Sequence, residues 1–79
     1  MTVAIKLKSL LKMKNKQHSQ LAEFLGISRQ SLTNKFFRGS FSAVDLIKIA
    51  AFLNCDLCFL IDESKVSLTI NDIGEVNNE

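Results

Sequence analysis

The 79-residue sequence contains no proline, tryptophan or tyrosine and only three glycines, two cysteines and one histidine. Its longest unbroken apolar runs, residues 49–53 and 57–61, are five residues each, whereas a membrane-spanning helix needs about 20. We therefore expect no membrane span. The three glycines stand far apart in the sequence, which excludes a glycine-rich loop that cradles phosphate.

Too few metal-binding residues are present for an obvious metal site. Cys55 and Cys58 form a Cys-x-x-Cys motif, but there is no second cysteine pair, and the only histidine, His18, is distant in sequence. We interpret both cysteines as structural thiols. Two alternatives stay open from the motif alone: a redox role for the cysteine pair, and a four-cysteine metal site shared across a dimer.

No catalytic constellation is evident either. His18 has no nucleophile or carboxylate partner in a recognisable arrangement, so we expect no enzymatic activity, no cofactor and no small-molecule ligand. The N-terminus carries lysines but no apolar stretch of the kind found in secretion signals. The sequence therefore predicts reduced thiols and a cytoplasmic location.

Charge is distributed unevenly along the chain. With 47% hydrophobic and 23% charged residues, the composition is that of one small folded domain. Residues 1–40 contain eight basic residues and a single acid, Glu23, a balance of +7. Residues 41–79 contain two basic and seven acidic residues, a balance of −5. This asymmetry indicates that the N-terminal half binds a polyanion.

Helical periodicity dominates as far as residue 54. The spacing predicts a helix over residues 3–14 with Thr2 as N-cap, then helices over 18–25 and 29–37, and a fourth that Ser42 starts and Asn54 ends. Gly26 and Gly39 are expected to end the second and third helices. The stripe expected to be buried on the first helix is Val3, Leu7, Leu10 and Leu11. The phenylalanines are expected mostly in the core, with Phe24 or Phe37 partly exposed: Phe24, Phe36, Phe37, Phe41, Phe52 and Phe59.

Strand-like alternation follows the helices. Residues 57–61 and 66–70 flank a turn at Asp62-Glu63-Ser64, which is typical of a β-hairpin. An isolated ribbon is marginal in water, and both faces of this one hold apolar residues. We expect one side to pack on the helices and the other to pair with a second chain, a monomer with the hairpin folded back being the alternative. The predicted dimer-interface residues are Leu57, Phe59, Leu60, Ile61, Val66 and Leu68.

The most informative segment is Leu21-Ala22-x-x-Leu25-Gly26-Ile27-Ser28, which is followed by a polar helix. It predicts a short helix that ends on glycine, a tight turn with one apolar anchor, and a second helix starting from a serine cap. The polar residues at the start of that second helix suit the reading of bases, because arginine pairs with guanine, and glutamine or asparagine with adenine, in the major groove. These residues are Arg29, Gln30, Thr33 and Asn34.

This segment resembles the helix-turn-helix domain of the phage Cro and cI repressor (XRE-type) family, over about residues 3–54. The resemblance implies that the second helix lies across the DNA backbone and the third lies in the major groove. It implies base reading by Arg29, Gln30 and Asn34, with Thr33 a weaker candidate. The backbone contacts that it implies are Gln17, His18, Ser28, Lys35 and Arg38.

The sequence departs from that family at several positions. Many relatives pair an arginine of the first helix with a glutamate near the end of the third, where this chain has Leu11 and Phe36. An apolar pair in place of a buried ion pair is compatible with stability, because no charge is desolvated. Lys16 stands where an apolar residue is usual, and His18 stands where a glutamine is usual.

The expected fold is mostly α, with a four-helix Cro/cI-like helix-turn-helix domain over residues 1–54, a β-hairpin over 55–70 and a flexible acidic tail over 71–79. The expected function is a repressor-like, sequence-specific DNA-binding regulator. It would bind double-stranded DNA at a pseudo-palindromic operator as a homodimer with recognition helices roughly 34 Å apart. The alternative is a protein-interaction module, such as an antitoxin or adaptor, with only weak non-specific DNA binding.

Overall fold

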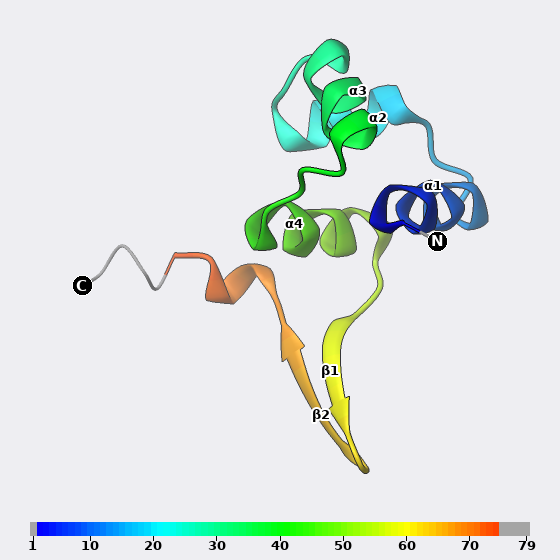
Figure 1. Ribbon diagram of the computed structural model, residues 1–79. Coiled ribbons are helices and arrows are strands. Elements are labelled where there is room, and N and C mark those ends of the chain that lie inside the picture. Colours follow the sequence, from blue (N-terminus) through cyan, green and yellow to red (C-terminus); the bar gives the residue numbers. More distant parts are fainter. Residues whose placement is uncertain (1, 75–79) are drawn as a thin grey trace.

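A computed structural model describes residues 2–74 and consists of a helical body with a projecting hairpin (Figure 1). The body contains α1 (Val3–Met13), α2 (His18–Leu25), α3 (Arg29–Arg38) and α4 (Ala43–Leu53). The hairpin consists of β1 (Leu57–Ile61) and β2 (Ser64–Leu68), and a short 3-10 helix, η1 (Ile70–Asp72), follows it. The expected fold class is thereby confirmed. None of the described helices is long and apolar enough to traverse a bilayer.

The helix ends follow the predicted capping residues. The side chains of Thr2, Ser28 and Ser42 each accept a hydrogen bond from the backbone N–H three residues later, which satisfies a donor that the helix leaves free. Gly26 (φ 73°) and Gly39 (φ 67°) end α2 and α3 in the left-handed region, where a residue without Cβ is unstrained. α1 ends at Met13, one residue earlier than expected, and α3 continues to Arg38.

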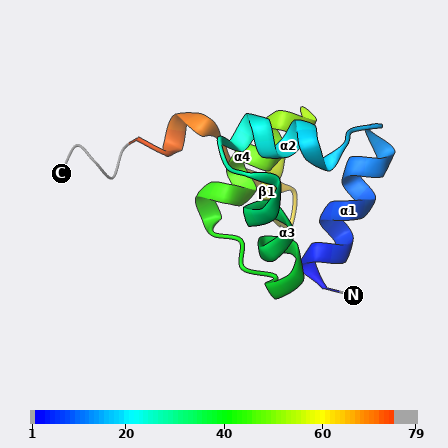
Figure 2. The same cartoon turned by 90° about the horizontal axis from the view of Figure 1, so that it is seen from above.

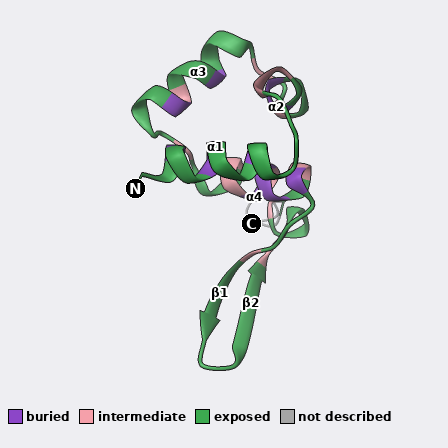
Figure 3. Cartoon of the chain, turned by 90° about the vertical axis from the view of Figure 1, so that its right-hand side faces the viewer, coloured by how far each residue is buried: buried purple, intermediate pink, exposed green. Residues whose placement is uncertain are grey.

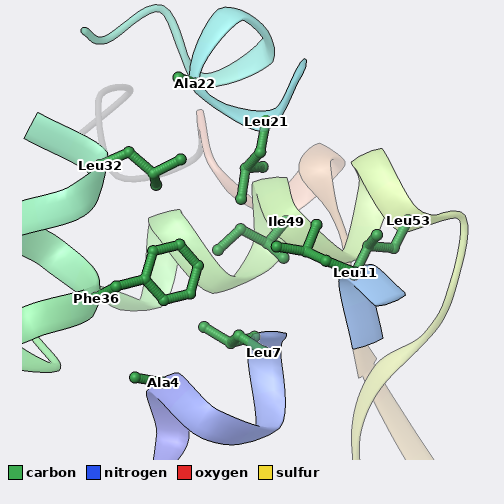
Figure 4. Packing of buried hydrophobic residues seen from close by; sticks show 9 residues of the cluster. All are labelled: Ala4, Leu7, Leu11, Leu21, Ala22, Leu32, Phe36, Ile49 and Leu53. Atoms are coloured by element: carbon green, nitrogen blue, oxygen red, sulfur yellow. The ribbon is translucent and has the colours of Figure 1, made fainter. Parts of the chain in front are cut away.

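The core lies where the four helices meet (Figure 4). Leu11, Leu21, Leu32, Ile49 and Leu53 are each at most 2% exposed. The other members of the cluster are Ala4, Leu7, Ala22 and Phe36.

On α1 the buried positions are Ala4, Leu7 and Leu11, whereas Val3 is 52% and Leu10 36% exposed. The expected α1 stripe was therefore wrong at two positions. Residues 4, 7 and 11 lie along one face of a helix, and Ala4 lets α1 approach the body closely there.

The expectation that the phenylalanines lie mostly in the core was right for three of them and wrong for Phe59. Phe36 is buried, and Phe41 and Phe52 pack against the core cluster, but Phe37 is 89% exposed. Phe37 follows Phe36 on α3 and therefore projects about 100° away around the helix axis. Phe24 is half exposed, with its ring 5.2 Å from that of Phe52, and Phe59 on the hairpin is also exposed.

The hairpin extends away from the helical body, and most of both strands is exposed (Figure 3). Only Leu57 and Leu68, the pair at its base, are partly buried. The expectation that one side packs on the helices was thus wrong, because the strands leave the body at their first residue pair. β2 begins at Ser64 rather than Val66, so Asp62 and Glu63 alone make the turn.

The segment after the hairpin is partly structured. Ile70 leaves the strand and enters η1, which contacts α4. Thr69 and Asp72 cap this short helix, with the Thr69 N–H donating to the Asp72 carboxylate at 2.8 Å. The tail expected from residue 71 therefore starts with an ordered turn, and residues 75–79 lie outside the described part of the chain.

Candidate nucleic-acid interface

The turn between α2 and α3 spans Gly26, Ile27 and Ser28. The N–H of Gly26 donates to the carbonyl of Glu23, and the N–H of Ile27 donates to that of Ala22, both at 3.1 Å. The Ile27 side chain packs against the core cluster. Buried residues of both helices, Leu21, Ala22 and Leu32, hold the pair together. The two helices and their turn form the helix-turn-helix unit that the sequence predicted.

Polar side chains cover the outer face of α3. Arg29, Gln30, Thr33 and Asn34 are all exposed, while Leu32 and Phe36 of the same helix face the core. The Gln30 Nε2 donates to the Asn34 Oδ1 at 3.3 Å, which links the two amides one turn apart. Within the described residues, the Gln30 Oε1 accepts no hydrogen bond and the Asn34 Nδ2 donates none. The pair therefore presents an acceptor and a donor outward, the combination that matches an adenine edge.

Two of the residues predicted to contact the DNA backbone are engaged within the chain. The Ser28 Oγ accepts from the Ser31 N–H at 3.0 Å and donates to the Ser31 Oγ at 3.1 Å, so its hydroxyl serves as the α3 cap. The Lys35 Nζ lies 2.9 Å from the Asp45 Oδ2, which joins α3 to the start of α4.

The Asp45 carboxylate has two partners. It accepts from the Ser42 N–H in the α4 capping box, it pairs with the Lys35 ammonium, and it is only partly exposed. Burial favours the neutral acid, but the hydrogen bonds from Ser42 and Lys35 outweigh burial and hold the pKa of Asp45 below its ordinary value. The loop from α3 to α4 is thereby fixed at both of its ends.

The remaining predicted backbone contacts lie at the ends of α2 and α3. Gln17 is the exposed residue that precedes α2, and its N–H donates to the Gln20 Oε1 at 2.8 Å. The His18 ring is partly buried and stacks on that of Phe36, with centroids 4.8 Å apart and planes 17° apart. This contact fixes the start of α2 against α3. Arg38 is exposed at the end of α3.

The structure also gathers cations that the site prediction did not include. The Lys8 Nζ lies 5.7 Å from the centroid of the Phe36 ring, and the Lys16 Nζ lies 5.5 Å from that of Phe52. The sequence indicated these residues only through the excess of lysines in and just after the first helix. Their contacts with rings of α3 and α4 depend on tertiary packing, which residue spacing does not encode.

The hairpin register separates the six residues predicted to form a dimer interface. Phe59 pairs with Val66, and Leu60 pairs with Lys65. Because side chains alternate between the faces of a strand, Leu60 lies opposite to the other five. Those five residues share one face: Leu57, Phe59, Ile61, Val66 and Leu68.

The second face of the hairpin is more polar. It holds Cys58, Leu60, Lys65 and Ser67, and the Lys65 Nζ lies 2.8 Å from the Asp56 Oδ2. Cys55 and Cys58 are exposed free thiols. Within residues 2–74, no three or more His, Cys, Asp or Glu side chains gather as a metal site would require.

The arrangement of the helices agrees with a comparison of the sequence with known families. The family model described as the bacteriophage CI repressor helix-turn-helix domain matches residues 3–63, which span all four helices and β1. No curated protein and no solved structure matches the chain. The match confirms the resemblance to the Cro and cI repressors, and it supports a regulator that binds DNA. The chain belongs to the bacteriophage CI repressor helix-turn-helix family of DNA-binding domains.

Proposed function

We propose that the protein is a sequence-specific transcriptional repressor that binds a pseudo-palindromic operator as a homodimer, with α3 in the major groove. The observation that carries this proposal is the outer face of α3, where Arg29, Gln30 and Asn34 are exposed at the end that follows the turn. Residues in the first turns of a recognition helix are those that reach base edges.

The proposed roles follow from side-chain chemistry. Arg29 offers two parallel N–H donors to a guanine, while the linked amides of Gln30 and Asn34 suit an adenine. Thr33 lies beside them and supplies a methyl group or hydroxyl. Gln17, His18 and Arg38 hold backbone phosphates. Ser28 acts chiefly by capping α3, since its hydroxyl already bonds to Ser31, whereas the Lys35 ammonium has two further donors for a phosphate beside its contact with Asp45.

The homodimer would form through the apolar face of the hairpin. Phe59, Ile61 and Val66 on that face are 58–64% exposed, and they form a continuous apolar surface on a ribbon that is marginal alone. A second copy of the hairpin supplies a matching apolar face about a two-fold axis, whereas the opposite face carries the Asp56–Lys65 ion pair. The acidic half of the chain, which includes the hairpin, would then lie away from the DNA phosphates.

Selection from a pool of random DNA duplexes tests the proposal as a whole. We expect enrichment of two inverted half-sites whose centres are about 10 base pairs apart, one helical turn of DNA. Enrichment of a single half-site would contradict the dimer while leaving base reading intact. Weak binding without any enriched motif would favour the protein-interaction module instead.

The role of Arg29 has a separate test. Arg29→Ala is expected to weaken binding to the selected operator by about 1–3 kcal/mol, with a much smaller loss on mixed-sequence DNA, because a bidentate base contact discriminates between sequences. Fluorescence anisotropy titrations on both duplexes measure the two losses. Arg38→Ala is the matched control and should weaken both complexes alike, as removal of a phosphate contact does. Equal losses with Arg29→Ala would rule out base reading by this residue.

A further inference from the structure

An open groove of about 400 Å³ runs along α1 towards the start of α2. Lys8, Lys12 and Lys16 line it together with His18, and none of the lining residues is acidic. Figure 2 shows the link that joins α1 to α2. We call this groove, with Lys8, Lys12 and Lys16 in its lining, the α1 lysine groove. Its lining carries three cations and lies outside the residues assigned to base reading.

Aromatic rings hold the two outer lysines of the groove. The Lys8 ammonium lies over Phe36 of α3, at 5.7 Å from the ring centroid, and the Lys16 ammonium lies over Phe52 of α4, at 5.5 Å. A cation above a ring face is attracted by the ring's quadrupole, so these side chains sample fewer positions than free lysines. The charges are therefore partly arranged before any ligand binds, which lowers the entropy lost on binding.

One residue that lines the groove, His18, contacts the recognition helix α3. His18 stacks on Phe36, the same ring beneath Lys8. Phe36 is a buried residue of α3, and the outer face of that helix carries Asn34 and Thr33. One ring thus connects the groove to the helix proposed to read bases.

We propose that the α1 lysine groove binds phosphates of the DNA strand that flanks the base pairs read by α3, an inference that rests on the proposed function. Lys8 and Lys12 are four residues apart on α1, which places their Cα atoms about 6 Å apart along the helix axis. Lys16 follows the end of the helix and lines the same groove. Three cations along one open groove complement a chain of phosphates better than a single small anion.

The test compares two double variants that remove the same charge. K8Q/K12Q neutralises two groove lysines, and K6Q/K14Q neutralises two lysines of the same segment that do not line the groove. Each protein is titrated into a fluorescein-labelled mixed-sequence duplex at several salt concentrations. The slope of log K against log salt changes by about 0.9 for each phosphate that the protein ceases to neutralise, so the groove variant should differ from wild type by about 2. The control should differ by well under 1.

K8R/K12R keeps both charges and should restore the wild-type slope. Circular dichroism melts of all variants establish that each is folded under the titration conditions. Equal slopes for the groove and control variants would overturn the groove proposal, because the lysines would then act only through the overall field. Absence of duplex binding by the wild-type protein would overturn the proposed function and the groove with it. The two failures are therefore distinguishable.

Discussion

Leu11→Arg is expected to leave most of the protein unfolded at room temperature. Leu11 is 2% exposed and packs with Ile49 and Leu53 in the core (Figure 4). No polar or charged side chain is buried in the described part of the chain, so nothing in the core supplies a counter-charge. The substitution therefore removes a buried leucine and adds a cation whose solvation is lost without compensation.

The expected loss is comparable with the whole stability of the domain. Removing a buried leucine side chain costs about 2–5 kcal/mol, and an uncompensated buried charge costs about 3–5 kcal/mol more. A chain of this length has a free energy of unfolding of about 4–12 kcal/mol. Thermal melts and urea titrations followed by circular dichroism, at one protein concentration, measure the loss.

Two matched variants isolate the effect of burial. Leu10→Arg places the same charge one residue earlier, on a side chain that is 36% exposed, and should cost about 1 kcal/mol or less. Leu11→Met keeps the volume and polarity of the site and should cost less than about 1.5 kcal/mol. An unchanged melting temperature for Leu11→Arg would show that this position is not part of the core.

The helical body was predictable because its signals are local. Ser28, Gly26 and Ser42 act on backbone groups within three or four residues, so their effect on helix ends can be read from the sequence. The capping box of Ser42 with Asp45 is a signal of the same kind. The helix-turn-helix unit consists of such signals in a fixed order, and the family match agrees with it.

The placement of side chains relative to other elements was less predictable. The Lys35 contact with Asp45, ten residues later, was not predicted, because it depends on the α3–α4 loop that brings the two together. That Lys35 also holds DNA phosphate stays a prediction. One of Phe24 and Phe37 was expected to be partly exposed, but both are exposed. Helical spacing identifies a face but not how much of it the neighbouring helices cover.

The hairpin shows the same limit of prediction from sequence, here for strands. Alternation of apolar residues predicted two strands, and the two-residue turn at Asp62 and Glu63 fixes which residues pair. Alternation alone does not say whether a strand packs on its own chain. Alternation within β1 puts Leu60 on the face opposite to Phe59, whereas its pairing with Lys65 depends on the register between the strands, which neither strand encodes by itself.

Phe59→Ser is expected to convert the proposed homodimer into monomers, whereas Leu60→Ser is expected to leave it intact. Phe59 and Val66 are partners in the centre of the apolar face, and both are more than half exposed in the single chain. Large aromatic side chains at the centre of an interface commonly contribute about 2 kcal/mol or more, equivalent to roughly a 30-fold weaker dimer or beyond. Leu60 is 70% exposed as well, but it lies on the opposite face.

Light scattering coupled to size-exclusion chromatography measures the mass of each variant over a range of concentrations. The two variants should also differ in their affinity for an operator with two half-sites. Phe59→Ser should lower that affinity strongly, because linkage of two binding modules raises avidity by about 10²–10⁴, whereas Leu60→Ser should leave it unchanged. Binding to one half-site should change little with either variant. A chain truncated after Asn54 retains the residues of the core cluster and should be monomeric.

The contrast between adjacent residues makes the result specific to one face. Both substitutions place a serine on β1 and remove a large exposed apolar side chain, so a general loss of strand propensity would affect both equally. Dissociation by Phe59→Ser alone would mean that the apolar face is the interface. Dissociation by Leu60→Ser alone would place the partner on the face that carries the Asp56–Lys65 ion pair. A dimer that persists in the truncated chain would move the interface to the helical body.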